Sequence, residues 1–313
     1  MSGSGGNKAV VAALAANLGI AVSKFVAFAF TGSSSMLAEG IHSVADSGNQ
    51  LLLLYGGRQA RRAPDDQHQF GHGSARYFYA FVVAVVLFTL GSLFALFEGI
   101  QKLLHSHQLD RPGIAVGVLL IAIVLEGLSF RTAIVESRPE RHNKKWLQFI
   151  RQSRSPELPV ILLEDFGALV GLTLALVGVA LSIVTGDSRY DAAGTLSIGV
   201  LLAVIAVVLA VETKSLLLGE SASTPHEEAI EAALRDGPAI ERLIDLKTLH
   251  LGPEELLVAA KVQMTPSLTF AGVAQAINEA EARVRAVVPI ARVIYIEPDV
   301  FRADYDARAE TSG

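Results

Sequence analysis

The sequence predicts a six-helix transmembrane bundle followed by a small C-terminal cytoplasmic α+β domain with the element order α-β-β-α-β. Two observations carry this prediction. Of the 313 residues, 51% are hydrophobic and only 18% are charged, and the mean hydropathy is positive. The apolar residues also cluster into runs near the roughly 20-residue length of a membrane-spanning helix, and these runs stop near residue 218.

The predicted transmembrane domain covers residues 1–218. Lysine and arginine concentrate in the loops after the second and fourth helices, whereas the opposite loops offer only Arg111 and Arg189. We therefore expect a multi-pass protein of the inner (cell) membrane. The positive-inside rule predicts that both termini and both basic loops face the cytoplasm. The six helices are expected at about 9–31, 36–57, 77–104, 113–136, 158–185 and 191–218.

Residues 219–300 have the composition of a soluble domain. A helix starting near Pro225 precedes two strand-like runs, "RLIDLKTLHL" and "ELLVAAKVQM". A second helix at about 269–288 and a last strand, "ARVIYIEP", complete an α+β sandwich. Residues 301–313 are expected to form a disordered tail.

The second predicted helix carries ionisable groups on one narrow face. Around a helix axis, His42 lies roughly 60° and Asp46 roughly 20° from Glu39. An ionisable residue inside a membrane span is costly and usually lines a polar pathway or pairs with a partner. A simpler alternative is that Glu39 and His42 lie near the non-cytoplasmic end and reach water.

The fifth predicted helix supplies complementary groups, Glu164 and Asp165, within an apolar run. A stripe of small residues at helical spacing allows another helix to approach closely. Carboxylates and an imidazole from two close helices suit a divalent cation, and the absence of cysteine excludes thiolate ligands and disulfides. The stripe consists of Gly167, Ala168, Gly171, Ala175 and Gly178.

With these motifs the chain resembles the cation diffusion facilitators, a family of zinc and manganese transporters. The loop "PDDQHQFGHGSARYF" is similar to the family signature Pro-Asp-x-x-His-x-Phe-Gly-x-Gly. The segments "SMLAEGIHSVADSGNQ", "LEGLSF" and "SRSPELPVILLEDFGALVGL" are closer still to the branch containing the mitochondrial zinc transporter. The resemblance covers roughly residues 8 to 300.

The resemblance implies a central metal site in which His42, Asp46 and Asp165 match three of the family's four ligands. The fourth position, four residues before Asp165, holds Ile161, which cannot ligate a metal. Another side chain or water must complete the ligand shell. The candidates for an additional ligand are Glu164, Glu39 and Glu126.

The same resemblance implies a second, exposed metal site in the loop after the second helix. Asp65, His68 and His72 stand at its ligand positions. The alternative is that these residues only cap a turn in a hydrated loop. All three offer lone pairs to a metal, which slightly favours the metal site.

The C-terminal domain departs from the family pattern. Members with a binuclear zinc cluster there use histidines at positions that correspond to Ile244, Lys261 and Tyr295. None of these side chains replaces a histidine ligand, and Lys261 would repel a cation. We therefore interpret residues 219–300 as a dimerisation domain.

The predicted function is export of a divalent cation, foremost Zn²⁺, from the cytoplasm in exchange for protons, by alternating access in a homodimer. The metal is the substrate; no cofactor, enzymatic activity or nucleic-acid partner is expected, and the remaining partner is the lipid bilayer. Because one nitrogen ligand is missing, Mn²⁺, Fe²⁺ or Co²⁺ are alternative substrates. An intramembrane hydrolase is the alternative from another class, and Ile161 leaves open a third, a dimer partner that does not itself transport metal.

Overall fold

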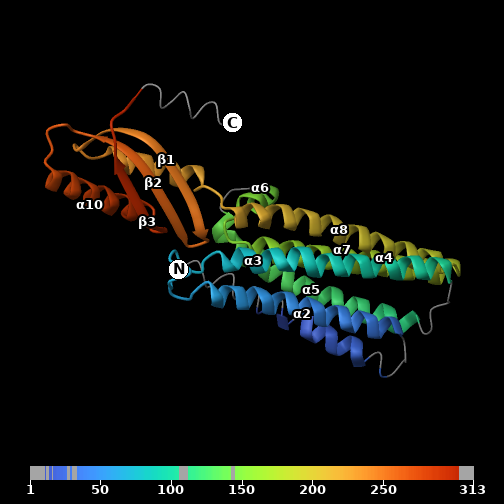
Figure 1. Ribbon diagram of the computed structural model, residues 1–313. Helices are drawn as coiled ribbons and strands as arrows, with labels where there is room; N and C mark the ends of the chain where they lie inside the picture. The colour runs from blue at the N-terminus through green and yellow to red at the C-terminus, as the bar shows by residue number, and fades with distance from the viewer. Residues whose placement is uncertain are drawn as a thin grey trace. The chain divides into compact units, whose positions relative to one another are not determined.

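The computed structural model describes residues 11, 14–15, 17–26, 29, 34–105, 112–141 and 145–302 (Figure 1). Within these ranges the side chains of residues 34–42, 45, 87 and 112 are not described. The chain divides into two compact units, Met1–Arg62 with Ala75–Leu217, and Ala63–Ser74 with Leu218–Gly313. The loop after the second helix thus groups with the C-terminal unit, whereas the sequence assigned it to the transmembrane domain.

The first unit is helical. A continuous helical run contains α3 (Ala75–Val82), a π-helical turn η1 (Val83–Leu87) and α4 (Phe88–Leu104). The other helices of this unit are α2 (Ser34–Gln59), α5 (Pro112–Arg141), α6 (Trp146–Gln152), α7 (Glu157–Thr185) and α8 (Arg189–Leu218). Neither α6 nor the π-helical turn was predicted, and α5 continues past residue 136.

In the described part of the chain, four helices are long and apolar enough to cross a membrane. They are Ala75–Leu104, Gly113–Arg141, Glu157–Thr185 and Arg189–Leu218. Helix α2 has 26 residues, roughly 39 Å of length, but its polar residues lower its hydropathy. Asn17–Val26 forms a shorter apolar helix, and much of the remainder of 9–31 lies outside the described residues. The six-helix count therefore stays a prediction.

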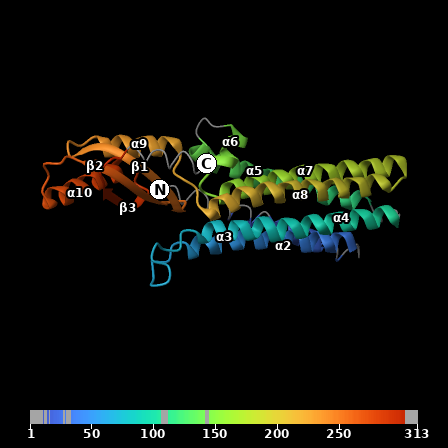
Figure 2. The same cartoon turned by 45° about the horizontal axis from the view of Figure 1, so that its top comes forward.

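The small-residue stripe of α7 packs against α8. A Cβ atom on Gly178 would lie 2.9 Å from the carbonyl oxygen of Tyr190, and one on Gly194 would lie 3.0 Å from that of Leu174. Backbones this close leave no room for a side chain at either position. The two helices run side by side in both views (Figures 1 and 2), so the close partner of the stripe is the following helix.

The second unit is a three-stranded sheet with two helices. Strand β1 (Ile240–Gly252) pairs antiparallel with β2 (Glu255–Met264), and β2 pairs in parallel with β3 (Ala291–Pro298). Helices α9 (Thr224–Arg235) and α10 (Phe270–Val287) contact each other and lie beside the strands in Figure 2. The described elements follow the predicted α-β-β-α-β order.

One face of this sheet forms the core of the second unit. Along β2 every second side chain is buried, as expected for a strand with one covered face. These side chains share an apolar cluster with Ile230 and Leu234 of α9 and with Val284 of α10. The two helices therefore cover the same face of the sheet.

Candidate functional site

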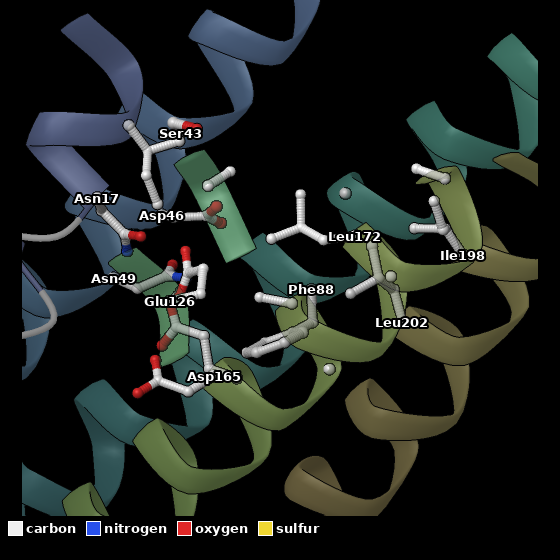
Figure 3. Close-up of a pocket in the computed structure, with 18 of the residues that line it drawn as sticks. Asn17, Ser43, Asp46, Asn49, Phe88, Glu126, Asp165, Leu172, Ile198 and Leu202 are labelled. Atoms are coloured by element: carbon white, nitrogen blue, oxygen red, sulfur yellow. Dashed lines mark hydrogen bonds between the residues drawn. The ribbon is translucent and has the colours of Figure 1, made fainter. Parts of the chain in front are cut away.

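A cavity of about 120 Å³ lies among the helices of the first unit. Four carboxyl groups line it: Asp46 from α2, Glu126 from α5, and Glu164 and Asp165 from α7. Figure 3 shows the side chains of Asp46, Asn49, Glu126 and Asp165 gathered at one end. The other end is apolar and is formed by Phe88, Leu172, Ile198 and Leu202.

Glu164 is tied to α2 by two amide side chains. Its Oε1 accepts hydrogen bonds from Asn49 Nδ2 at 3.2 Å and from Gln50 Nε2 at 2.7 Å. Within the described residues, no hydrogen-bond donor reaches Oε2 of Glu164 or Oδ1 of Asn49, although both oxygens are buried. Two buried acceptors without donors on a polar cavity are the kind of group that a cation satisfies.

Asp165 is held by the neighbouring helix. Its Oδ2 accepts a 2.9 Å hydrogen bond from the hydroxyl of Ser129 on α5, and its side chain is 2% exposed. Helices α5 and α7 pack along much of their length. The carboxyl group is therefore oriented by α5 while it borders the cavity.

The sequence-predicted transport-site residues are brought together only in part. Asp46, Asp165, Glu164 and Glu126 line the same cavity. The side chains of Glu39 and His42 lie outside the described residues, although both positions belong to α2. Glu126 and Glu164 border the cavity from different helices, so either could add an oxygen ligand.

Ile161 is fully buried in the main apolar cluster of the first unit, among Leu158, Val160 and Leu209. It is not one of the residues that line the cavity. The position therefore contributes to packing rather than to the lining of the cavity.

Sequence reasoning missed the polar residues that accompany the carboxyl groups. Asn49 and Gln50 follow Asp46 by three and four positions, the spacing of neighbours on one helix face, and this signal was present in the sequence. Ser129 and Asn17 carry weaker signals, because isolated small polar residues are common in helices. Lys24, a charge within an apolar run, was the clearest signal overlooked.

The predicted loop site is a compact cluster in the second unit. Asp65, His68 and His72 each offer one ligand atom, and these atoms all lie within 4.8 Å of one another. Asp65 Oδ1 is 3.2 Å from His68 Nδ1, and its Oδ2 is 3.1 Å from His72 Nε2. The two imidazole ring centres are 4.4 Å apart, so small movements would let all three contact one ion.

The loop backbone also shapes this cluster. The His68 N–H donates a 2.7 Å hydrogen bond to Asp65 Oδ1, and the Gln67 N–H donates one at 3.0 Å. These bonds, led by that of His68, lower the pKa of Asp65 to about 2. Asp65 thus caps the turn and also faces both imidazoles, so the geometry is compatible with the turn cap and with the metal site.

In the C-terminal sheet, the ammonium group of Lys261 lies 3.1 Å from Glu297 and 3.6 Å from Asp299. The Val300 N–H and the Lys261 charge help lower the pKa of Asp299. Tyr295 is 58% exposed on β3, whereas His250 is buried with Nδ1 3.2 Å from the Gly252 carbonyl oxygen. The charge of Lys261 thus balances the carboxylates of Glu297 and Asp299.

Residues 10–218 match the family model described as the cation efflux transmembrane domain. The matched segment contains the cavity, the loop cluster and every described helix of the first unit. This family consists of transporters rather than enzymes, which removes the alternative of an intramembrane hydrolase.

Individual relatives agree with this match. The chain is 32% identical over 260 residues to the mitochondrial proton-coupled zinc antiporter SLC30A9 of Xenopus laevis, covering 82% of this chain and 46% of that protein. It is 29% identical over 257 residues to metal tolerance protein C4 of Arabidopsis thaliana, covering 82% and 56%. It is 27% identical over 252 residues to the cation-efflux pump FieF of Salmonella arizonae, covering 80% and 79%.

The chain spans about half the length of the SLC30A9 relatives. The chain is a multi-pass membrane protein that belongs to the cation diffusion facilitator family, close to the SLC30A9 branch, as the sequence motifs predicted.

Proposed function

We propose that this protein exports a divalent metal cation, Zn²⁺ foremost, from the cytoplasm in exchange for protons. The observation that carries the proposal is the convergence of four carboxyl groups from three helices on one cavity in a largely apolar unit. So many acidic groups are costly in a membrane unless a cation or protons neutralise them. The names of the antiporter and efflux-pump relatives support the same activity.

The proposed transport ligands are His42, Asp46 and Asp165, with Glu164 as the first choice for a fourth. Asp165 is oriented by Ser129, and Oε2 of Glu164 is buried without a donor among the described residues. Glu126 borders the same cavity and is the alternative, and Glu39 remains a third candidate. A metal requires these groups deprotonated, so protons and metal compete for them.

The proposed cycle is alternating access in a homodimer with both termini in the cytoplasm. Asp65, His68 and His72 form the proposed second metal site, and residues 219–300 form the proposed dimerisation domain. The small-residue contacts between α7 and α8 support a close pair of helices on one side of the cavity. In the cycle, the cavity opens to each side of the membrane in turn.

Mn²⁺ is the second candidate substrate, and Fe²⁺ and Co²⁺ follow it. The described ligand atoms at the polar end of the cavity are carboxylate and amide oxygens, which suit harder cations than imidazole does. His42 is the one proposed nitrogen ligand. Calorimetric titration of the purified protein with Zn²⁺, Mn²⁺, Co²⁺ and Cd²⁺ ranks these metals directly.

Transport is tested in proteoliposomes with an acidic lumen and zinc outside. For protein with its cytoplasmic face outward, we expect zinc to accumulate in the lumen and accumulation to stop when an ionophore collapses the pH gradient. Asp46→Ala serves as the inactive comparison. Absence of zinc, manganese, cobalt and cadmium flux in folded wild-type protein would refute the proposal.

A further inference from the structure

Lys24 is the one basic side chain among the described residues that line the acidic cavity. It belongs to the apolar helix Asn17–Val26 and is only 5% exposed. Its Nζ donates a 2.9 Å hydrogen bond to the hydroxyl of Ser43 on α2. Ser43 precedes Asp46 by three residues, so the two lie on one face of α2, and the ammonium group belongs to the polar end of the cavity.

The charge of Lys24 acts on one of the carboxyl groups that line the cavity. The ammonium group attracts the carboxylate of Glu126, which lines the cavity from α5. A buried ammonium is costly inside a membrane unless anionic groups compensate it. The acidic lining of the cavity is the described environment that can compensate it.

A purely structural role for Lys24 would be to join its helix to α2 through Ser43. An uncharged donor such as glutamine could make that bond without the cost of burying a charge. What a lysine adds is a fixed positive charge beside the candidate metal ligands. A divalent cation that enters the cavity must therefore overcome repulsion from this charge.

We propose that Lys24 is a built-in cation of the transport cavity: it compensates the carboxylates when metal is absent, weakens metal binding and thereby favours metal release. This inference rests on the proposed metal transport. In this proposal Lys24 does not bind the metal. Its charge sets how tightly the metal is bound and therefore how readily it is released. A transporter gains from such an arrangement because a site that binds too tightly cannot discharge its substrate.

The test compares Lys24→Gln with wild type in zinc titration calorimetry and in proteoliposome flux. Glutamine keeps a donor for Ser43 but removes the charge. We expect the zinc dissociation constant to fall about tenfold, the half-saturating zinc concentration to fall as well, and the maximal flux to decrease. Lys24→Arg, which keeps the charge, should bind zinc about as weakly as wild type does.

Lys102→Gln is the matched control, because Lys102 is another lysine in a membrane-spanning helix. It lies 3.2 Å from Asp191 on α8 and does not line the cavity. The zinc affinity of Lys102→Gln should equal that of wild type. A similar gain in affinity for Lys102→Gln would overturn the proposal, because the effect would then follow from net charge alone.

Unchanged or weaker zinc binding by folded Lys24→Gln would also overturn the inference. If this variant fails to fold, Glu126→Gln is compared with the double variant Lys24→Gln/Glu126→Gln, in which one charge of each sign is removed. The double variant should bind zinc more tightly than Glu126→Gln, and equal or weaker binding would refute the role of Lys24. Failure of wild type to bind any metal would instead refute the proposed function.

Discussion

Gln50 on α2 donates a 2.7 Å hydrogen bond from Nε2 to Oε1 of Glu164 on α7, and both side chains are buried. Gln50 in turn accepts a 3.3 Å hydrogen bond from Asn17. One oxygen of Glu164 is thus committed to amide donors, while its second oxygen remains for another partner.

Glu164→Gln should weaken zinc binding at least about tenfold, because the substitution removes an anionic oxygen from the cavity. If Glu164 carries protons rather than metal, the variant should bind zinc normally but lose the dependence of transport on the pH gradient. Calorimetry and flux measurements distinguish these outcomes. Glu212→Gln on α8, outside the cavity, is the control. Unchanged affinity together with unchanged proton coupling would show that Glu164 is structural.

Asp165→Ala should abolish zinc flux in proteoliposomes while the protein remains folded, because the variant loses a proposed ligand. Ser129→Ala removes only the hydrogen bond that orients Asp165, so its zinc affinity should fall by a smaller factor, roughly threefold to tenfold. Wild-type flux by Asp165→Ala would end the assignment of this residue to the transport site.

His72→Ala should lower the number of bound zinc ions by one per chain without loss of the transport site. The neighbouring acid in Asp66→Ala provides the control, since Asp66 is not part of the ligand cluster. Zinc binding to the loop should weaken in acid, because protons compete with zinc for its ligands. The Asp65 carboxylate stays available to zinc until the pH approaches its own pKa of about 2. An unchanged zinc count for His72→Ala contradicts the loop site.

The isolated C-terminal domain, residues 219–300, should fold and pair without metal. It has its own apolar core, and Lys261 already balances Glu297 and Asp299. Its melting temperature should shift by less than about 2 °C with micromolar zinc, because only a ligand that binds the folded form stabilises it. A rise of many degrees would reveal a zinc site that we do not expect.

Arg76→Ala should destabilise the first unit by about 3 kcal/mol. Arg76 on α3 forms an ion pair with Glu157 on α7, whose side chain is buried. Loss of the guanidinium group leaves a carboxylate buried without this partner. Thermal unfolding in detergent should show the loss, and Arg76→Ala/Glu157→Gln should recover part of it. Arg58→Ala, an exposed arginine at the end of α2, should change stability little.

Features that depend on the spacing of nearby residues could be predicted from the sequence. The apolar runs, the helix-strand order of the C-terminal domain and the loop motif all follow from neighbours a few residues apart. The same holds for the acidic residues in apolar helices, since a charge in such a run stands out whatever the fold. Family membership was visible for this reason, because its motifs are short and ordered along the chain.

Which side chains meet was decided only by the tertiary structure. Gln50 and Glu164 are 114 residues apart, and Ser129 lies 36 residues from Asp165; no local pattern encodes such pairs. The sequence showed that Ile161 cannot ligate, but only helix packing placed it in an apolar cluster away from the cavity lining. Packing likewise brought Lys24 to the acidic cavity, because burial in a low-dielectric unit favours placing a cation beside anionic groups.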